Sequence, residues 1–307
     1  MVRSLLPFAA LLATGLSWGA TVSLATLATA DGHHPMSVAL WNAGVGLAIL
    51  SVVLLIRGKR PPIDGAWLIF YAVTGLIGTA APHTLTFFAA DNLPAGPRAV
   101  VYALIPMMTL LGSVLIGLER ARLRRFAGLL IGFVAVGLMI DPNFQAAGPD
   151  HVFWMGCALA AVTCYAVENL YVAKRRPPHV DTPTMLWGVT FASMLWLIPA
   201  LAAMDLPILP PTRIDRDEAA LLAMAGLHLG AYGGLFFMIQ RAGAVFASQV
   251  SYVVTPAGVL WGLVLLDESL SLRVALATGL VLVGLSLIRP NPIEAPAPTN
   301  DRSSPPT

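Results

Sequence analysis

Two stretches of this chain repeat the same pattern. Residues 97–140 read PRAVVYALIPMMTLLGSVLIGLERARLRRFAGLLIGFVAVGLMI, and residues 247–288 read ASQVSYVVTPAGVLWGLVLLDESLSLRVALATGLVLVGLSLI. With Pro106 aligned to Pro256, each copy predicts an apolar helix with a proline inside it, a short charged turn and a second apolar helix. The chain therefore carries an internal duplication.

The alignment extends beyond the two prolines. A tyrosine stands four residues before each proline, and a glutamate follows in each charged turn within one residue of the same place. Two glycines five residues apart then occur in each second helix. These paired positions are Tyr102 and Tyr252, Glu119 and Glu268, Gly132 and Gly279, and Gly137 and Gly284.

The composition places this duplication in a membrane. Of the 307 residues, 57% are hydrophobic and only 11% are charged, whereas soluble domains carry about 25% charged residues. Apolar segments of about 20 residues separated by short charged turns are typical of helices that cross a bilayer. The sequence thus predicts an all-α integral membrane protein, and the small net charge of +2 gives no reason to expect a nucleic-acid partner.

We expect ten transmembrane helices in two five-helix repeats. The expected spans are 5–28, 35–56, 66–90, 97–118, 126–140, 152–173, 184–204, 219–240, 245–266 and 272–288. The first repeat comprises residues 1–142 and the second comprises residues 151–289. Residues 290–307 are rich in Pro, Ser and Thr without an apolar period, so this tail is expected to be disordered in the cytoplasm.

The first expected helix also resembles a signal peptide. Arg3 precedes an apolar run that ends in Ala28-Thr29-Ala30, which has the form of a cleavage site. The run is longer than the hydrophobic core of a typical signal peptide, which has about 7–15 residues. We therefore expect this segment to be retained as a helix.

The basic residues set the orientation. With the N-terminus inside, all but four of the 18 Lys and Arg residues fall in cytoplasmic segments, the exceptions being Arg98, Arg213, Arg216 and Arg273. Cytoplasmic loops carry the excess of Lys and Arg in membrane proteins. Both termini are therefore expected in the cytoplasm.

An odd number of helices in each half inverts the second half relative to the first. The turn after the fourth helix carries Arg120, Arg122, Arg124 and Arg125 and is expected to face the cytoplasm. Its counterpart, residues 267–273, retains one arginine and is expected to face out. Inverted repeats of this kind are typical of membrane transporters built from two related halves.

On these residues the chain resembles the drug/metabolite transporter superfamily, in particular the ten-helix group with two EamA repeats. The likeness covers the chain from about residue 5 to residue 288. It rests on Ser17-Trp18-Gly19, on Pro106, Glu119, Gly128, Gly132 and Gly137, and on Pro256, Glu268, Gly279 and Gly284. Glu119 follows Gly-Leu and Glu268 follows Leu-Asp, where the family often has Gly-Glu, which leaves the capping of this turn open.

The resemblance implies a multi-pass carrier of the inner (plasma) membrane with a central cavity between the repeats. Members of this family often export amino acids, metabolites or drugs. We therefore expect a carrier that exports a small solute by alternating access, as a monomer or a homodimer, and not an enzyme. No cofactor is expected.

Two alternatives stay open from the residues themselves: an intramembrane enzyme and a membrane protein that does not transport. Residues 15–19, Gly-Leu-Ser-Trp-Gly, match the nucleophile elbow of serine hydrolases. That chemistry needs a strained turn from a strand into a helix, whereas these residues lie in an apolar span. His83 or His228 would have to serve as the base.

The two prolines are candidate hinges. A proline inside a helix frees the carbonyl four residues earlier, which belongs to Tyr102 for Pro106 and to Tyr252 for Pro256. In a bilayer that carbonyl must face protein or a water-filled cavity. The alternative is a packing kink whose free carbonyl is satisfied by a neighbouring side chain.

Polar residues inside the spans are few, which makes each of them informative. The candidates for a solute site are Trp18, His83, Tyr102, Tyr165, Glu168, His228 and Tyr252. His83, His228 and Glu168 are ionisable groups in this position, Asn42, Asn169 and Gln240 are amides, and the aromatic candidates are Trp18, Tyr102, Tyr165 and Tyr252. The histidines and the glutamate show no metal-ligand spacing, so no metal is inferred.

Glu168 admits two hypotheses. In one, its side chain extends toward Arg175, seven residues further along the same helix face. In the other, Glu168 faces the cavity and carries a proton or pairs with a cationic group, which would couple transport to protons.

Small residues predict where helices touch. Gly226, Gly230 and Gly234 recur at intervals of four on one expected helix. Such spacing lets two helix backbones approach closely in a membrane. We expect this face to pack inside the bundle, with an oligomer interface as the alternative.

Overall fold

A computed structural model of the chain describes residues 2–28, 33–85, 101, 104–120, 122–138, 151–209 and 216–265, and seven single positions between 272 and 287. Every regular element in these residues is helical. The elements are α1 (Val2–Ala28), α2 (Pro35–Ile56), α3 (Gly65–Gly75), the π-helix η1 (Leu76–Ala80), α6 (Ile105–Leu115), α7 (Leu123–Leu138), α8 (His151–Arg175), α9 (Thr182–Ala203), α10 (Arg216–Ala242), α11 (Ala244–Ser248) and α12 (Val250–Leu265).

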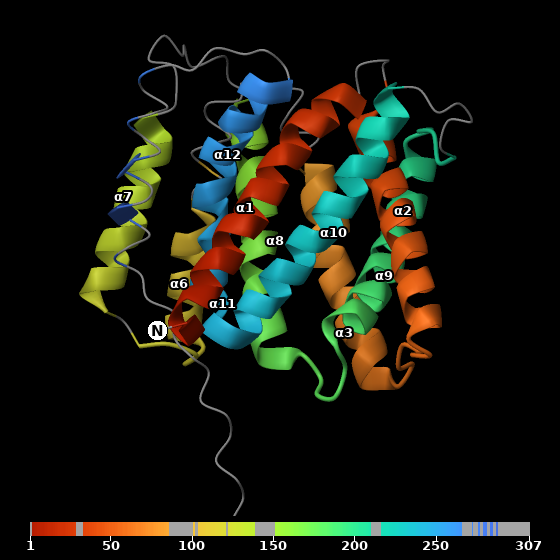
Figure 1. Ribbon diagram of the computed structural model, residues 1–307, viewed down its shortest axis with the longest axis horizontal. Coiled ribbons are helices and arrows are strands. Elements are labelled where there is room, and N and C mark those ends of the chain that lie inside the picture. The colour runs from red at the N-terminus through yellow and green to blue at the C-terminus, as the bar shows by residue number, and fades with distance from the viewer. Residues whose placement is uncertain are drawn as a thin grey trace, which may run out of the picture.

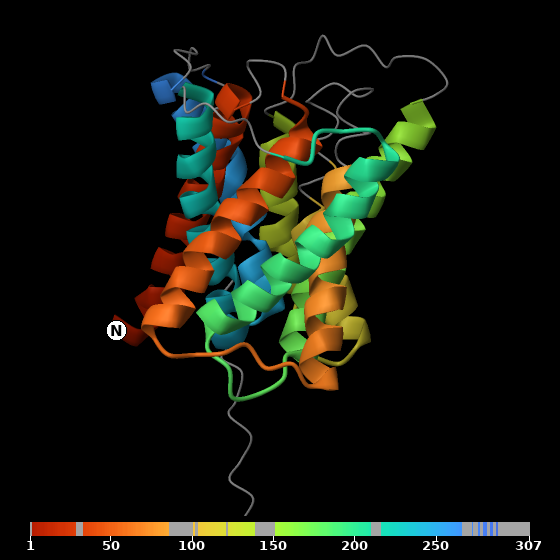
Figure 2. The same cartoon turned by 90° about the vertical axis from the view of Figure 1, so that its right-hand side faces the viewer.

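The helices form an elongated bundle. α1 packs along α10 and α12, α9 packs against α2 and α3, and α6 packs against α8. Figure 1 shows α7 at one edge of this bundle and α2 at the opposite edge. Figure 2, which faces that second edge, shows α2 and α9 running side by side.

The described helices are those of a multi-pass membrane protein. Six segments are long and apolar enough to cross a bilayer: Pro35–Ile56, Gly65–Leu85, Phe153–Arg175, Thr182–Ala203, Ala219–Ala242 and Ala244–Leu265. Large apolar side chains such as Val52, Leu55 and Ile69 point outward and are more than half exposed. An apolar surface of this kind requires lipid around it.

One end of the bundle collects the basic connections. The connections α2–α3, α6–α7, α8–α9 and α10–α11 lie at the same end as the N-terminus (Figure 1). The sequence assigned these same segments to one side of the membrane. Their gathering agrees with that assignment, and the side on which this end faces stays a prediction.

The helix boundaries follow local signals. Pro35 stands in the first turn of α2, where its missing N–H has no helical acceptor, and the His34 side chain accepts from the Met36 N–H. α2 ends before Gly58, which adopts φ +61 as the left-handed residue after the helix. The observed bounds of α2 equal the expected span 35–56.

Two expected helices differ from the structure. The expected span 245–266 is divided at Gln249 into α11 and α12. α6 begins at Ile105, so Pro106 lies in its first turn and not in its interior. A proline in a first turn removes no helical hydrogen bond, because the first N–H groups have no acceptor. The expected helix 272–288 and the tail lie outside the described residues, apart from single positions.

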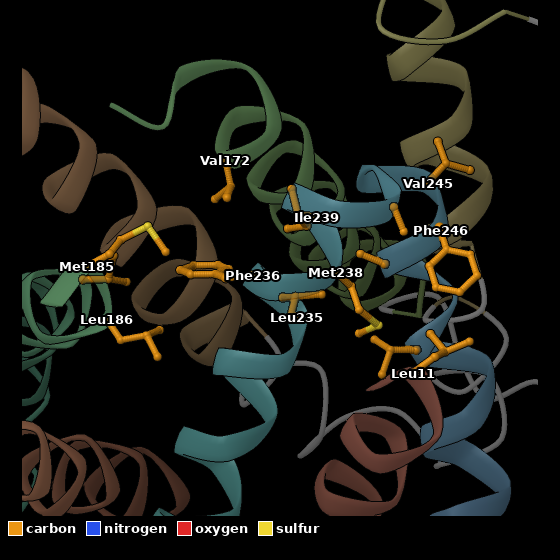
Figure 3. Close-up of a cluster of buried hydrophobic side chains, with 14 of the residues drawn as sticks. Leu11, Val172, Met185, Leu186, Leu235, Phe236, Met238, Ile239, Val245 and Phe246 are labelled. Carbon is orange, nitrogen blue, oxygen red and sulfur yellow. The ribbon is translucent and has the colours of Figure 1, made fainter. Parts of the chain in front are cut away.

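The core of the bundle centres on the last turns of α10 (Figure 3). Phe236 and Met238 are fully buried there. The labelled side chains come from five helices: Leu11, Val172, Met185, Leu186, Leu235, Phe236, Met238, Ile239, Val245 and Phe246. α1 belongs to this core through Leu11, and its retention stays a prediction.

The glycines of α1 bring it close to α12. A Cβ added at Gly15 would overlap the side chain of Val253, and one at Gly19 would overlap Ala257. Residues 15–19 lie in the interior of a continuous helix. The strand-to-helix turn of a nucleophile elbow is therefore not formed here, and Gly15 and Gly19 serve helix packing.

The glycines of α10 do not all pack as expected. Gly234 faces Thr14 of α1 at a distance that leaves no room for a Cβ, but no atom lies within 4 Å of a Cβ built at Gly226 or Gly230. Both of these glycines are exposed. The expectation of internal packing is confirmed for Gly234, which lies against α1, and wrong for Gly226 and Gly230, which lie at the surface of the described bundle.

The turn between α6 and α7 holds a buried ion pair. The Glu119 carboxylate pairs with the Arg125 guanidinium, and both side chains are more than nine-tenths buried. The glutamate in this turn thus ties the end of α6 to the start of α7. The equivalent residue of the second repeat, Glu268, lies outside the described residues.

Candidate functional site

A cavity of about 40 Å³, with polar groups in a mostly apolar wall, lies among α2, α9, α10 and the helix that runs through η1 to Leu85. Its apolar wall includes Leu186 and Val189 of α9. Its polar lining consists of Asn42, Thr79, His83, Thr190, Ser193, His228 and Tyr232.

Helical spacing brings these polar groups together. His228 and Tyr232 are four residues apart on α10, so they share one face. Thr190 and Ser193 are three apart on α9 and share a face in the same way. Thr79 lies in η1, whose wider turn changes the direction of the side chains that follow it. π-turns of this kind occur frequently at functional sites.

Aromatic rings close one side of the cavity. The Trp18 ring of α1 meets His228 edge-on, with 6.1 Å between ring centroids, and meets Tyr232 at 5.6 Å. The rings of His228 and Tyr232 are 5.4 Å apart. Trp18 therefore braces the two cavity-lining rings of α10.

Glu168 lies directly behind Tyr232. The Tyr232 hydroxyl is 3.1 Å from Glu168 Oε1 and 2.7 Å from the carbonyl oxygen of Gly78 in η1. The Glu168 side chain is 2% exposed, and it fills the space in which a Cβ at Gly78 would stand. One carboxyl group thus joins α8, α10 and η1.

Two lining groups have buried atoms without a hydrogen-bond partner among the described residues. These are Asn42 Oδ1 and His83 Nδ1. A buried polar atom without a partner costs about 1–3 kcal/mol. A bound solute or water in the cavity would supply the missing bonds.

The structure brings together four of the residues that the sequence singled out. His83 and His228 line the cavity, Trp18 packs on its aromatic wall, and Glu168 is bonded to the lining residue Tyr232. The hypothesis of a pair between Glu168 and Arg175 is wrong, because Glu168 turns inward to Tyr232 while Arg175 is exposed.

Two expected site residues in the described part of the chain, Tyr165 and Tyr252, do not line the cavity. Tyr165 packs in a separate cluster with Val101 and Ile105. Tyr252 is 1% exposed, and its hydroxyl donates to the Leu129 carbonyl of α7 at 3.0 Å. Tyr102 lies outside the described residues. Tyr252 therefore joins α12 to α7 instead of facing a solute here.

The sequence interpretation missed Tyr232, which holds the site together, and named Asn42 only as a buried amide. A signal for Tyr232 exists in its spacing. It follows His228 by four residues, so a helical reading of α10 places both on one face.

The cavity is small in this conformation. A volume of about 40 Å³ accommodates a few water molecules, whereas pockets that bind small ligands have about 300–1,000 Å³. A metabolite would fit only after the surrounding helices move apart. Within the described residues, no group of three or more His, Cys, Asp and Glu side chains is arranged to hold a metal ion.

Comparison with known proteins gives consistent relatives. The model of the EamA-like transporter family matches residues 6–140 and again residues 152–289. The uncharacterized inner membrane transporter YedA of Escherichia coli K12 is 26% identical over 290 residues, which cover 93% of this chain and 92% of YedA. The protein PecM of Dickeya dadantii is 27% identical over 265 residues, covering 83% of this chain and 82% of PecM.

A solved crystal structure shows the same fold. It superposes with a TM-score of 0.74 over 93% of this chain and 96% of its own, at 21% sequence identity. Since the family model covers most of the sequence in two stretches, the chain belongs to the EamA-like transporter family, within the drug/metabolite transporter superfamily.

Proposed function

We propose that this transporter exports a small metabolite, amino acid or drug by alternating access through the cavity between α2, η1, α9 and α10. The observation that carries the proposal is the convergence of polar groups in an apolar bundle, where Asn42 Oδ1 and His83 Nδ1 have no hydrogen-bond partner in the part of the chain that the structure describes. Polar residues this deep in a membrane protein mark solute paths.

The movement proposed is a rocking of two inverted repeats, residues 1–142 and 151–289. The family model matches once in each repeat, which supports this division. Transporters of this construction hold the solute near the midplane, between their repeats. Pro256, inside α12, and Pro106, in the first turn of α6, are the proposed hinges.

A counterflow experiment tests the function. The purified protein is reconstituted into proteoliposomes, which are loaded with one unlabelled solute at a time. The solutes are amino acids, nucleosides and cationic drugs, and the uptake of the same solute in labelled form is followed. We expect saturable exchange with one of these classes. Absence of exchange with every class would contradict the proposal.

A matched pair of variants tests the site. Asn42→Leu removes the unpartnered oxygen from the cavity, and Asn169→Leu removes a similarly buried and unpartnered oxygen of α8 that does not line it. Asn42→Leu loses one hydrogen bond to the solute, so the solute concentration at half-maximal exchange should rise about three- to tenfold. If both substitutions changed half-saturation equally, after correction for the amount of folded protein, the solute would bind elsewhere.

A further inference from the structure

The Tyr232 hydroxyl carries one hydrogen and faces the Gly78 carbonyl and the Glu168 carboxyl group, and it also has a hydrogen bond with the Thr79 side chain. It lies 2.7 Å from the Gly78 carbonyl oxygen, 3.1 Å from Glu168 Oε1 and 3.4 Å from Glu168 Oε2. A tyrosine hydroxyl can donate only one hydrogen bond, but its oxygen can also accept. The shortest distance assigns the hydrogen to the Gly78 carbonyl. The contact between Tyr232 and Glu168 then needs a hydrogen from Glu168, which means that its carboxyl group is protonated.

The surroundings of Glu168 agree with a neutral carboxyl group. Within the described part of the chain, no Lys or Arg forms an ion pair with it. Neither α6 nor α11 carries a titratable side chain on its face toward α8. The titratable groups nearest Glu168 are Cys164, Tyr165 and Tyr171 on its own helix and Tyr232 of α10. His83 and His228 lie on the cavity wall with Tyr232, and α3, which also packs on α8, carries Tyr71.

Loss of the proton would rearrange this network. A carboxylate can only accept hydrogen bonds, and charge-assisted bonds are about twice as strong as neutral ones. The Tyr232 hydrogen would therefore turn from Gly78 to Glu168. The Gly78 carbonyl, in the middle of η1, would lose its donor from α10. η1 carries Thr79 and precedes His83, and both of these residues line the cavity.

We propose that Tyr232 is a proton-dependent switch between Glu168 and the wall of the cavity. While Glu168 is protonated, the Tyr232 hydroxyl holds the Gly78 carbonyl and fixes η1 against α10. When water enters the opening cavity, the Glu168 proton passes to it, the hydroxyl donates to the carboxylate, and η1 is released. Tyr232 is thus a positioning residue that couples proton release to movement of the wall. This proposal rests on the proposed carrier function and adds proton coupling to it.

Infrared difference spectroscopy tests the switch without any knowledge of the solute. The protein in lipid should show at neutral pH the carbonyl stretch of a protonated carboxylic acid, shifted in D₂O and lost in Glu168→Gln. Raising the pH should remove this band together with a change in the tyrosine ring bands. The proposal would be overturned if no carboxylic acid band depended on Glu168. It would also be overturned if raising the pH removed this band from the wild-type spectrum without changing the tyrosine bands.

Two tyrosine variants give the matched comparison. Tyr232→Phe retains the ring that packs on Trp18 and Phe236 but removes the hydroxyl. It should shift the carboxylic acid band and its pH midpoint. Tyr171→Phe removes a hydroxyl from α8 near Glu168, on a ring that stacks on Phe70, and should change neither. An unaltered band in Tyr232→Phe would show that Glu168 does not depend on this hydroxyl.

Transport assays distinguish a failure of the switch from a failure of the proposed carrier function. Tyr232→Phe should lose the dependence of uptake on a pH gradient whatever its rate of solute counterflow, whereas Tyr171→Phe should retain both counterflow and that dependence. Counterflow with an unchanged pH dependence in this variant would refute the switch and leave the carrier intact. A spectroscopic switch in a protein that exchanges no solute would refute the carrier function instead.

Discussion

Gly78 has no side chain at the point where the carboxyl group of Glu168 packs against η1. A methyl group there would displace the carboxyl group from Tyr232, and Glu168 is too deeply buried to find another partner. We expect Gly78→Ala to lower the midpoint of thermal unfolding in detergent by several degrees and to abolish exchange. Small-to-large changes at packed sites destabilise by about 1–3 kcal/mol.

A control and a second-site variant make this test specific. Gly156 of α8 has no atom within 4 Å of an added Cβ, so Gly156→Ala should leave stability unchanged or raise it slightly. Glu168→Ala removes the group with which the new methyl collides. The double variant Gly78→Ala/Glu168→Ala should therefore recover stability relative to Gly78→Ala. No recovery would mean that Gly78 is constrained by a contact other than Glu168.

The importance of single residues could be predicted only in part from the sequence. A carboxylate and two histidines in apolar spans are rare enough to stand out, and the structure brings Glu168, His83 and His228 to one place. The partner of Glu168 could not be predicted, because Tyr232 is 64 residues away and only the packing of α8 on α10 makes them neighbours.

Among the helices, α9 has the best-defined start. Asp181 caps it by accepting from the Thr184 N–H, and it also accepts from Lys59 Nζ at 2.8 Å and pairs with Arg57. Burial raises the pKa of the Asp181 carboxyl, but hydrogen bonds from Lys59 and Thr184 oppose it more strongly, and the net pKa lies below the ordinary 3.8. One side chain therefore fixes the α2–α3 connection to α9.

Two substitutions separate the cap from the ion pairs. Asp181→Ala should lower the free energy of unfolding by about 1 kcal/mol, because the cap is lost. Asp181→Asn retains a capping oxygen, so it should lower the free energy of unfolding by only a few tenths of a kcal/mol, since exposed ion pairs contribute little. A pKa that is lower in the folded protein gives stability that is present at neutral pH and lost as the pH falls below about 4. The difference between wild type and Asp181→Asn should vanish there, and a difference that grows on acidification would contradict the assignment.

The extent of the helices is largely readable from the sequence, and their irregularities are not. Apolar runs bounded by Pro, Asp and Gly locate α2 and α9 closely. The π-turn of η1 and the division at Gln249 have no comparable local signal. They depend on contacts between distant segments, such as the approach of Gly75 to the backbone of Ser193.

The internal duplication and the basic residues together predict a membrane carrier with inverted halves. The structure gathers the basic connections at one end, and the family comparison identifies a transporter. Alternating access requires more than this: the cavity must open to each side in turn. Its small volume in the present conformation makes that movement necessary for any solute to enter.

Ser193 offers the most direct test of this movement. It lines the cavity and is 1% exposed, so a cysteine there is reached only when the cavity opens. Ser248 of α11 is equally buried, also donates its hydroxyl hydrogen to a carbonyl three residues earlier, and does not line the cavity. Each Ser→Cys variant is made after Cys157 and Cys164 are replaced by Ala, since both are free thiols.

The measurement is labelling by a membrane-impermeant thiol reagent, applied to right-side-out and to inverted vesicles. Alternating access through this cavity predicts that Ser193→Cys is labelled from both sides, more slowly when transported solute is present, and that Ser248→Cys is labelled from neither. Labelling of Ser193→Cys from one side only, or from neither side, would contradict alternating access through this cavity.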